Sequence, residues 1–190
     1  MVHIASPCPA HMPAKDEEEG MIRTAVEGTL NVMRAALKHK VKRVVITSST
    51  AAVIDRANKV PGRVIDEEEW ADEHTTENSY SKSKILQEKA AWEYWRSIPE
   101  GERFELVALN PGNMFGPAYK REQFATANII RAIVTWSRVF GFPKIYYQVV
   151  DVRDAAYAHL QAVKVPEARN QRFLIVAEGM YWEMFGIYLK

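Results

Sequence analysis

Cysteine is nearly absent from this 190-residue chain, which contains one, Cys8. A single cysteine cannot form a disulfide within the chain, and without a second thiol at ligand spacing there is no thiolate metal site. None of the five histidines stands at metal-ligand spacing from another histidine or from Cys8, so we predict no metal centre. A reducing compartment is the simplest setting for such a sequence.

Long apolar runs and an excess of one charge are also missing. No run approaches the roughly 18 apolar residues of a membrane span, and the first twenty residues have neither the basic start nor the apolar stretch of a secretory signal. The 25 basic and 24 acidic residues give a formal net charge of +1, which leaves no general field to attract nucleic acid or an anionic membrane. We therefore expect a cytoplasmic protein that binds neither nucleic acid nor membrane.

What the sequence does contain is the composition of an ordinary globular domain, with 47% hydrophobic and 26% charged residues. Apolar residues recur at steps of three and four between positions 22 and 37, and the segment has an acidic start and a basic end. This pattern predicts a helix. The run VKRVVITSS follows it, and its consecutive β-branched residues are typical of a strand buried on both faces.

The alternation of helix and strand continues along the chain. Residues 50–78 have no sustained period and are predicted to form a long loop. The segment SYSKSKILQEKAAWEYW then shows helical spacing with Ser79 as its candidate N-cap, and FELVALNPG is a second buried strand. Further helices are expected at about 122–139 and 152–164, and short strands near 146–150 and 173–177. The sequence therefore predicts an α/β fold, with a parallel sheet and helices on both faces.

Ligands of such sheets bind beyond the carboxyl ends of the strands. The residues at these positions are Ser48 and Ser49 after the first buried strand, Asn110 to Met114 after the second, and Ala5 and Ser6 after the opening VHIA. A hydroxyl at such a position can hold a substrate oxygen. A Ser/Thr turn that satisfies the last amides of the strand is the alternative explanation of the serine pair.

Tyr80 and Lys84 stand four residues apart at the start of a predicted helix, so their side chains share one face. A phenol has an ordinary pKa near 10, and a neighbouring ammonium favours the phenolate. We therefore predict that Lys84 lowers the pKa of Tyr80 and makes proton exchange easier. On spacing alone, the pair is also consistent with a solvated helix start.

Five ordered segments then establish a resemblance: Ser49, YSKSK at positions 80–84, AAWEYW, FELVALNPGNMFGP and VVDVRDAAYAHLQA. With them, the chain resembles the extended short-chain dehydrogenase/reductases, within the NAD-dependent epimerase/dehydratase superfamily. The resemblance is closest to dihydroflavonol 4-reductases, cinnamoyl-CoA reductases and methylglyoxal-type carbonyl reductases. It covers nearly the whole chain.

The resemblance implies reduction of a ketone or aldehyde to an alcohol with NADP, or NAD, as cofactor and a small carbonyl compound as substrate. Tyr80 would donate a proton to the carbonyl oxygen, Ser49 would hydrogen-bond that oxygen, and Lys84 would lower the phenol pKa and hold the nicotinamide ribose. Ser49 is preferred over Ser48 because it matches the last serine of the family's pair. The implied cofactor-binding residues are Ile4, Ala5, Ser6, Tyr80, Lys84, Pro111, Gly112, Asn113 and Met114.

The same resemblance implies that part of the family's fold is absent. Family members open with a strand, a glycine-rich turn and a helix that binds the pyrophosphate, whereas this sequence starts at what resembles the fourth strand. We therefore expect an incomplete Rossmann-like doubly wound sheet in one partial NAD(P)-binding domain, residues 1–190. Its core would be 1–150, and 151–190 would be part of the substrate-binding region. Activity is expected to be impaired, and the open apolar sheet edge is expected to allow self-association.

Two other functions stay open. A sugar-nucleotide epimerase or dehydratase of the same superfamily would use the same serine, tyrosine and lysine, and a non-catalytic binding remnant would use none of them. Two further groups of residues are expected to be structural. Asp151, Arg153 and Asp154 fit an ion pair or a helix cap, and Trp92 and Trp95 fit core packing.

Overall fold

The computed structural model describes residues 1–8, 17–55, 63–76, 78–118, 125–140 and 145–184. Its main sheet has the strand order β1-β2-β3-β6. These strands are β1 (Val2–His3), β2 (Arg43–Thr47), β3 (Glu105–Pro111) and β6 (Gln171–Ile175). All three neighbouring pairs are parallel, which confirms the predicted α/β class. β6 begins two residues before the strand expected at 173–177.

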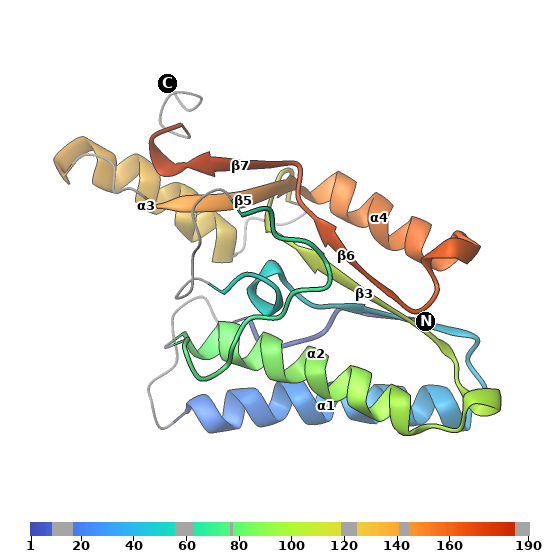
Figure 1. Ribbon diagram of the computed structural model, residues 1–190. Helices are drawn as coiled ribbons and strands as arrows, with labels where there is room; N and C mark the ends of the chain where they lie inside the picture. Colours follow the sequence, from blue (N-terminus) through green and yellow to red (C-terminus); the bar gives the residue numbers. More distant parts are fainter. Residues whose placement is uncertain (9–16, 56–62, 77, 119–124, 141–144, 185–190) are drawn as a thin grey trace.

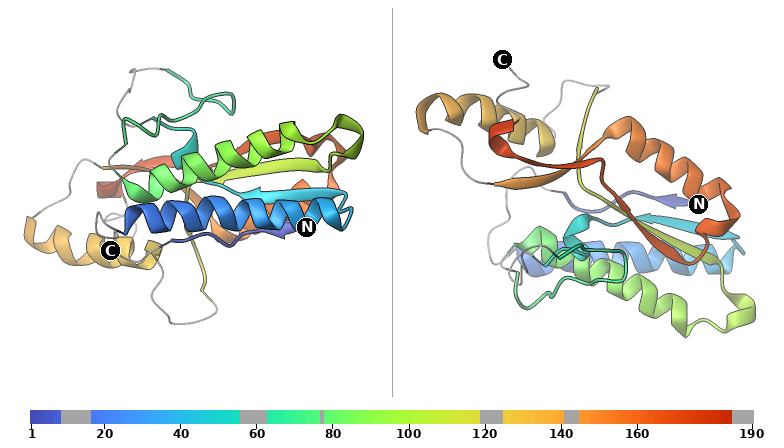
Figure 2. Two further views of the ribbon diagram at one scale, coloured as in Figure 1. Left: turned by 90° about the horizontal axis from the view of Figure 1, so that it is seen from below. Right: turned by 45° about the horizontal axis from the view of Figure 1, so that its top comes forward.

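Helices cover both faces of this sheet (Figure 1). α1 (Glu18–Lys38) and α2 (Ser79–Ser97) lie side by side on one face, and α4 (Val152–Lys164) lies on the other (Figure 2). Alternate side chains of a strand point to opposite faces. Val44 and Ile46 of β2 accordingly join the core beneath α1 and α2, while Val45 joins Ala162 in the core beneath α4. Two covered faces explain why the strand has no polar alternation.

The buried residues of α1, which include Met21, Ala25 and Met33, recur at steps of three and four along the helix, as predicted. The start of α2 differs from the prediction. Asn78 is the N-cap residue, and its side-chain oxygen accepts a hydrogen bond from the Ser81 amide at 2.9 Å. Asparagine is as good an N-cap as serine, and the Ser79 hydroxyl donates instead to Glu18 of α1 at 2.9 Å.

A second, three-stranded sheet has the order β4-β5-β7, formed by β4 (Asn113–Phe115), β5 (Tyr146–Asp151) and β7 (Glu178–Tyr181). β4 pairs with β5 in parallel, whereas β7 runs antiparallel to β5. The sequence did not predict β4 or β7, since three or four residues are too few to show a period. α3 (Ala125–Phe140) packs against β4, and residues 122–124 of the predicted helix lie outside the described part. The predicted division at residue 150 stays a prediction.

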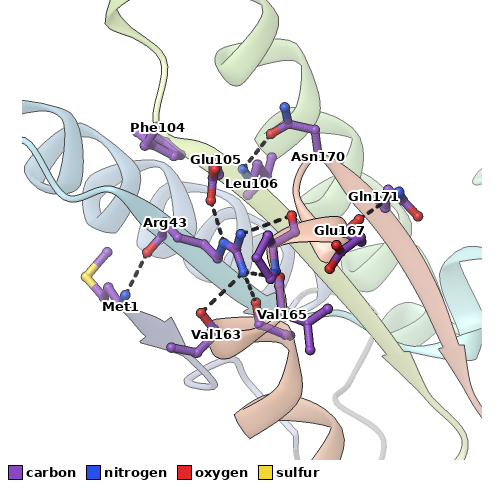
Figure 3. A network of polar contacts seen from close by, with 12 residues as sticks. Met1, Arg43, Phe104, Glu105, Leu106, Val163, Val165, Glu167, Asn170 and Gln171 are labelled. Carbon is purple, nitrogen blue, oxygen red and sulfur yellow. Dashed lines mark hydrogen bonds and ion pairs between the residues drawn. The ribbon is translucent and has the colours of Figure 1, made fainter.

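Arg43, at the start of β2, holds the end of α4 on the sheet (Figure 3). Its guanidinium donates to the carbonyl oxygens of Ala162, Val163 and Val165 at 2.9, 3.2 and 2.7 Å. It also forms an ion pair with Glu105 of β3 at 2.6 Å. The last carbonyls of a helix have no partner within it, and a cation there also complements the helix dipole. Arg43 therefore anchors the helix that covers this face.

Residues expected to be structural have that role. The Asp151 carboxylate caps α4 by accepting a hydrogen bond from the Arg153 amide at 2.8 Å, and it pairs with the Arg153 guanidinium at 2.7 Å. Trp92 is buried in the core, with Trp95 packed edge-on against it. Both interpretations are confirmed. Within the described residues, no helix is long and apolar enough to cross a membrane.

Candidate functional site

The candidate site lies where the carboxyl end of β2 meets the first turns of α2. Because neighbouring strands are parallel, the segments that follow β1, β2 and β3 leave the sheet at the same edge. Ser48 and Ser49 follow β2 and lead into the short helix η1 (Thr50–Ala52). Tyr80 and Lys84 enter from the start of α2, which contacts η1. Two segments far apart in the sequence thus supply one cluster.

The structure brings together the three residues predicted to be catalytic. The Ser49 side chain lies near enough to the Tyr80 phenol to lower its pKa as a hydrogen-bonding neighbour. The Lys84 ammonium lies over the Tyr80 ring, 5.9 Å from its centroid, and donates to the Thr47 carbonyl oxygen at 3.3 Å. Ser48 has a different partner, since its hydroxyl donates to the Glu88 carboxylate. Of the two serines, Ser49 is therefore the one that faces Tyr80.

The predicted direction of the Tyr80 pKa shift is wrong for the chain on its own. Burial, and after it the charge of Cys8, raise the pKa of Tyr80 from 10.0 to about 12, against a lowering by the Ser49 side chain. A phenolate taken out of water loses its hydration, and here this loss outweighs every favourable contact. Spacing along a helix shows which groups are close, but not how much water they retain. At neutral pH the Tyr80 phenol is protonated.

Lys84 is only 4% exposed. Burial lowers the pKa of its ammonium from 10.5 to about 8, against opposing attraction from Cys8 and Glu88. The removal of water disfavours the charged form of an amine. Lys84 therefore releases its proton closer to neutral pH than an exposed lysine does.

The predicted cofactor segment 4–6 lies beside this cluster. Ile4 and Ala5 are exposed after β1, and the half-buried Ser6 donates from its hydroxyl to the Gln87 side-chain oxygen at 3.1 Å. Gln87 is three residues after Lys84 in α2 and donates to the Thr29 hydroxyl at 2.6 Å. Burial, with the charge of Lys84, also lowers the pKa of His3 in β1. These contacts hold the segment after β1 next to the helix that carries Tyr80.

The segment 111–114 connects the two sheets. Gly112 allows a close approach of this segment to β5, because a β-carbon there would lie 2.6 Å from the Gln148 carbonyl oxygen. The Asn113 side chain donates to the same carbonyl at 3.2 Å. Pro111 is buried, and Met114 is half-buried in β4. Contact of these residues with a cofactor stays a prediction.

A polar cavity of about 350 Å³ lies next to the cluster. Its lining includes Ala51, two residues after Ser49, and Ser81, which follows Tyr80. The carboxylates of Asp55 and Asp72 line it as well. Most of its wall comes from the loop predicted over 50–78, of which residues 56–62 and 77 lie outside the described part. A second cavity of about 350 Å³, between α4 and β6, has an apolar lining. None of the predicted site residues lines either of these two cavities; the first lies beside the cluster only through chain neighbours of Ser49, Tyr80 and Lys84.

The sequence analysis missed the buried polar residues around the cluster, above all Glu88 and Gln87 of α2 and Arg172 of β6. Glu88 is four residues after Lys84, so the same helical spacing that identified Tyr80 and Lys84 could have identified it. Arg172 gives no such signal, because it reaches Glu88 only through the pairing of β6 with β3. Among the described residues, no group of three histidine, cysteine, aspartate or glutamate side chains could hold a metal ion.

Comparison with known proteins shows which family the chain is similar to. The model of the NAD dependent epimerase/dehydratase family matches residues 1–176. The chain is 33% identical to the NADPH-dependent methylglyoxal reductase GRE2 of Saccharomyces cerevisiae, over 95% of this chain and 56% of that protein. It is 36% identical to cinnamoyl-CoA reductase 1 of Arabidopsis thaliana, over 94% of this chain and 51% of that protein. The predicted resemblance is therefore confirmed.

A solved structure shows the same likeness in three dimensions. The yeast methylglyoxal/isovaleraldehyde reductase Gre2, crystallised with NADPH, superposes with a TM-score of 0.85 at 30% identity. The match covers 96% of this chain and 57% of that one. The chain thus spans about half the length of the curated relatives it matches.

Proposed function

The chain belongs to the NAD dependent epimerase/dehydratase family, and on that premise we propose that it acts in the NADPH-dependent reduction of small aldehydes or ketones to alcohols. The observation that carries this proposal is the convergence of the Ser49 hydroxyl, the Tyr80 phenol and the Lys84 ammonium. The names of the two curated relatives, a methylglyoxal reductase and a cinnamoyl-CoA reductase, support the same reaction type.

The residues present fit the nicotinamide end of NADPH, which when bound would supply a hydride to the carbonyl carbon. An ammonium has three donors, and within the described residues Lys84 uses one of them, on the Thr47 carbonyl oxygen. The others suit the hydroxyls of a ribose. The exposed Ile4 and Ala5 and the tethered Ser6 offer a surface for the middle of the cofactor. NADP is preferred to NAD because the first relative named is NADPH-dependent.

Tyr80 would act as the general acid. With its pKa raised to about 12, the phenol carries the proton that the carbonyl oxygen must receive when the carbon accepts hydride. The Ser49 hydroxyl would hydrogen-bond the same oxygen and fix the carbonyl in line with the phenol. Lys84 would stabilise the phenolate left behind, and its pKa of about 8 suits it to return a proton to Tyr80. One hydride and one proton convert the carbonyl to an alcohol.

The substrate would enter from the polar cavity beside Ala51 and Ser81. Its volume of about 350 Å³ suits a small carbonyl compound. Carboxylates and hydroxyls on its wall favour a substrate with polar groups around the carbonyl.

The variant Tyr80→Phe tests this function. Without its proton donor, the chain should lose about 100-fold or more of its turnover of aldehydes and ketones, measured as oxidation of NADPH. Its affinity for NADPH, measured by nicotinamide fluorescence, should be retained because the ring stays. The matched control is Tyr94→Phe, later on the same helix and packed against the core, which should keep full turnover.

Three results would contradict the proposal. Turnover that survives in Tyr80→Phe would remove the phenol from its role. Conversion of a sugar nucleotide without net oxidation of NADPH would indicate an epimerase or dehydratase instead. An unmodified chain that binds no NADPH would indicate a non-catalytic binding protein.

The exposed residues of β1 support the predicted self-association. β1 is an outer strand of the main sheet, and Met1, Val2 and Ile4 are exposed there. An apolar edge strand is able to pair with a second chain. This association, the cytoplasmic location and the absence of a nucleotide-binding half all stay predictions.

A further inference from the structure

Glu88 of α2 has no exposed surface. Its carboxylate accepts four hydrogen bonds, all from other side chains. One oxygen accepts from the Ser48 hydroxyl and from the Asn110 side-chain amide, the latter at 2.7 Å. The other accepts from the Trp92 indole at 3.3 Å and from the Arg172 guanidinium at 2.6 Å. The four partners come from the segment directly after β2, from β3, from β6 and from α2 itself, so one side chain ties the helix to three parts of the main sheet.

A carboxylate suits this position. All four partners present donors, and a carboxylate is the one side chain that accepts at both ends and donates at neither. An amide of the same shape would turn an NH₂ group toward two donors. The charge itself is balanced by Arg172, whose side chain is almost as deeply buried as that of Glu88. A buried ion pair of this kind is costly to break from one side.

Two of the residues that hydrogen-bond to Glu88 also adjoin Ser49. Ser48 directly precedes it, and the Asn110 amide donates both to Glu88 and to the Ser49 carbonyl oxygen, the latter at 3.1 Å. Tyr80, Lys84 and Glu88 follow one another at four-residue steps and so lie along one face of α2. The carboxylate therefore joins the helix that carries the phenol to the strand end that carries the serine.

Arg172 connects Glu88 to the loop that forms part of the wall of the polar cavity. Arg172 donates to the backbone carbonyl oxygens of Glu67 and Glu69 at 2.6 and 2.7 Å. Its guanidinium also lies 3.7 Å from the centroid of the Trp70 ring, within range of a cation–π interaction. The next residue, Ala71, lines the polar cavity.

We propose that Glu88 is a positioning residue, whose carboxylate sets the place of the Ser49 hydroxyl relative to the Tyr80 phenol through Ser48 and Asn110. Its effect on catalysis rests on the function proposed above. The placement of Ser49 is a property of the folded chain, and it can be measured without turnover.

The first test is Glu88→Gln, which keeps the shape of the side chain. The amide oxygen is expected to face the charged Arg172 guanidinium, which turns the NH₂ group toward the Ser48 and Asn110 donors, so the support of Ser49 from that side is lost. We expect kcat for carbonyl reduction to fall about tenfold, as for the loss of one hydrogen bond, with KM for NADPH unchanged. The control is Glu105→Gln. Glu105 is at the other end of β3 from Asn110 and forms an ion pair with Arg43 of β2, so its loss should leave kcat unchanged.

The second measurement needs no activity. In chain labelled with ¹³C at the tyrosine ring carbon that bears the hydroxyl, NMR follows the titration of Tyr80, whose signal is the one missing from Tyr80→Phe. The Ser49 side chain lowers the pKa of this phenol, so displacement of Ser49 in Glu88→Gln should raise it. Cys8 is the same in both chains. Loss of the Glu88 charge lowers the pKa of Lys84 from about 8, so Lys84 is neutral in both chains over the range in which Tyr80 titrates, near 12. Glu105→Gln should titrate like the unmodified chain.

Should Glu88→Gln fail to fold, Ser48→Ala removes one of the four donors and leaves the carboxylate in place. It should change the Tyr80 titration in the same direction and lower kcat by a smaller factor. Unchanged Tyr80 titration in a folded Glu88→Gln or Ser48→Ala chain would overturn the proposal, even if stability falls, because Glu88 would then be structural only. If the unmodified chain has no turnover but the titration moves as expected, the proposed function fails and the positioning role stands.

Discussion

Replacing Lys84 by methionine should make the chain more stable at neutral pH, although it removes a residue proposed for catalysis. Burial lowers the pKa of Lys84 from 10.5 to about 8, and each unit corresponds to about 1.4 kcal/mol. Keeping the ammonium charged in the folded chain therefore costs about 3 kcal/mol at pH 7. The lost hydrogen bond to the Thr47 carbonyl oxygen offsets about 1 kcal/mol of this. The net gain of about 2 kcal/mol should raise Tm by about 4–8 °C.

The gain should disappear as pH rises. The unfolded chain keeps the Lys84 proton up to its ordinary pKa of 10.5, whereas the folded chain releases it near 8. Between these values the unfolded state binds more protons, so this group makes the free energy of unfolding of the unmodified chain increase with pH. Above both values the amine is neutral in either state, and the penalty is gone. Tyr80 acts in the opposite direction from pH 10.0 to about 12, but in both chains alike.

The assay is urea unfolding followed by tryptophan fluorescence, at pH 7 and at pH 10, for the unmodified chain and for Lys84→Met. Lys42→Met, at an exposed position, is the control and should show no pH-dependent difference. A Lys84→Met chain less stable than the unmodified one at pH 7, or a stability difference equal at both pH values, would refute the reasoning. The expected result would mean that the site holds a charge at the expense of stability.

Two further substitutions test the frame around the site. Arg43→Met should lower the free energy of unfolding by about 3 kcal/mol, because α4 loses the charged donor on its last carbonyls, with NADPH affinity unchanged. An unchanged urea midpoint would show that the helix end needs no such anchor. Gly112→Ala should cost about 1–3 kcal/mol, since its β-carbon would lie 2.6 Å from the Gln148 carbonyl oxygen. Gly101→Ala, with nothing within 4 Å of the added carbon, should not destabilise in the same assay.

Elements with a long, regular pattern were predictable from sequence. α4 occupies Val152–Lys164, the predicted range, and β2 ends at Thr47 as the run VKRVVITSS indicated. The bonds within α4 join near neighbours in the chain and leave a helical period, and β2 is recognisable from its run of consecutive β-branched residues. The short strands β4 and β7 have no such period, because each is a strand only through its pairing with β5.

The choice of Ser49 over Ser48 shows where sequence reasoning needed help. The two serines are adjacent and chemically identical, and the preference for Ser49 came from a resemblance. In the folded chain, the Ser48 hydroxyl belongs to Glu88 and the Ser49 side chain to Tyr80. Side chains of consecutive residues leave an extended backbone in opposite directions, so what surrounds the strand end distinguishes the two serines.

The residues alone determined that this is an α/β chain of the epimerase/dehydratase family, with a phenol and an amine one helical turn apart, because spacing and motif order are properties of the chain itself. Tertiary structure decided the electrostatics. The raised pKa of Tyr80, the lowered pKa of Lys84 and the buried Glu88–Arg172 pair all depend on how much water the packed elements exclude. Exclusion of water comes from strands and helices far apart in sequence closing over one point, and no local pattern records it.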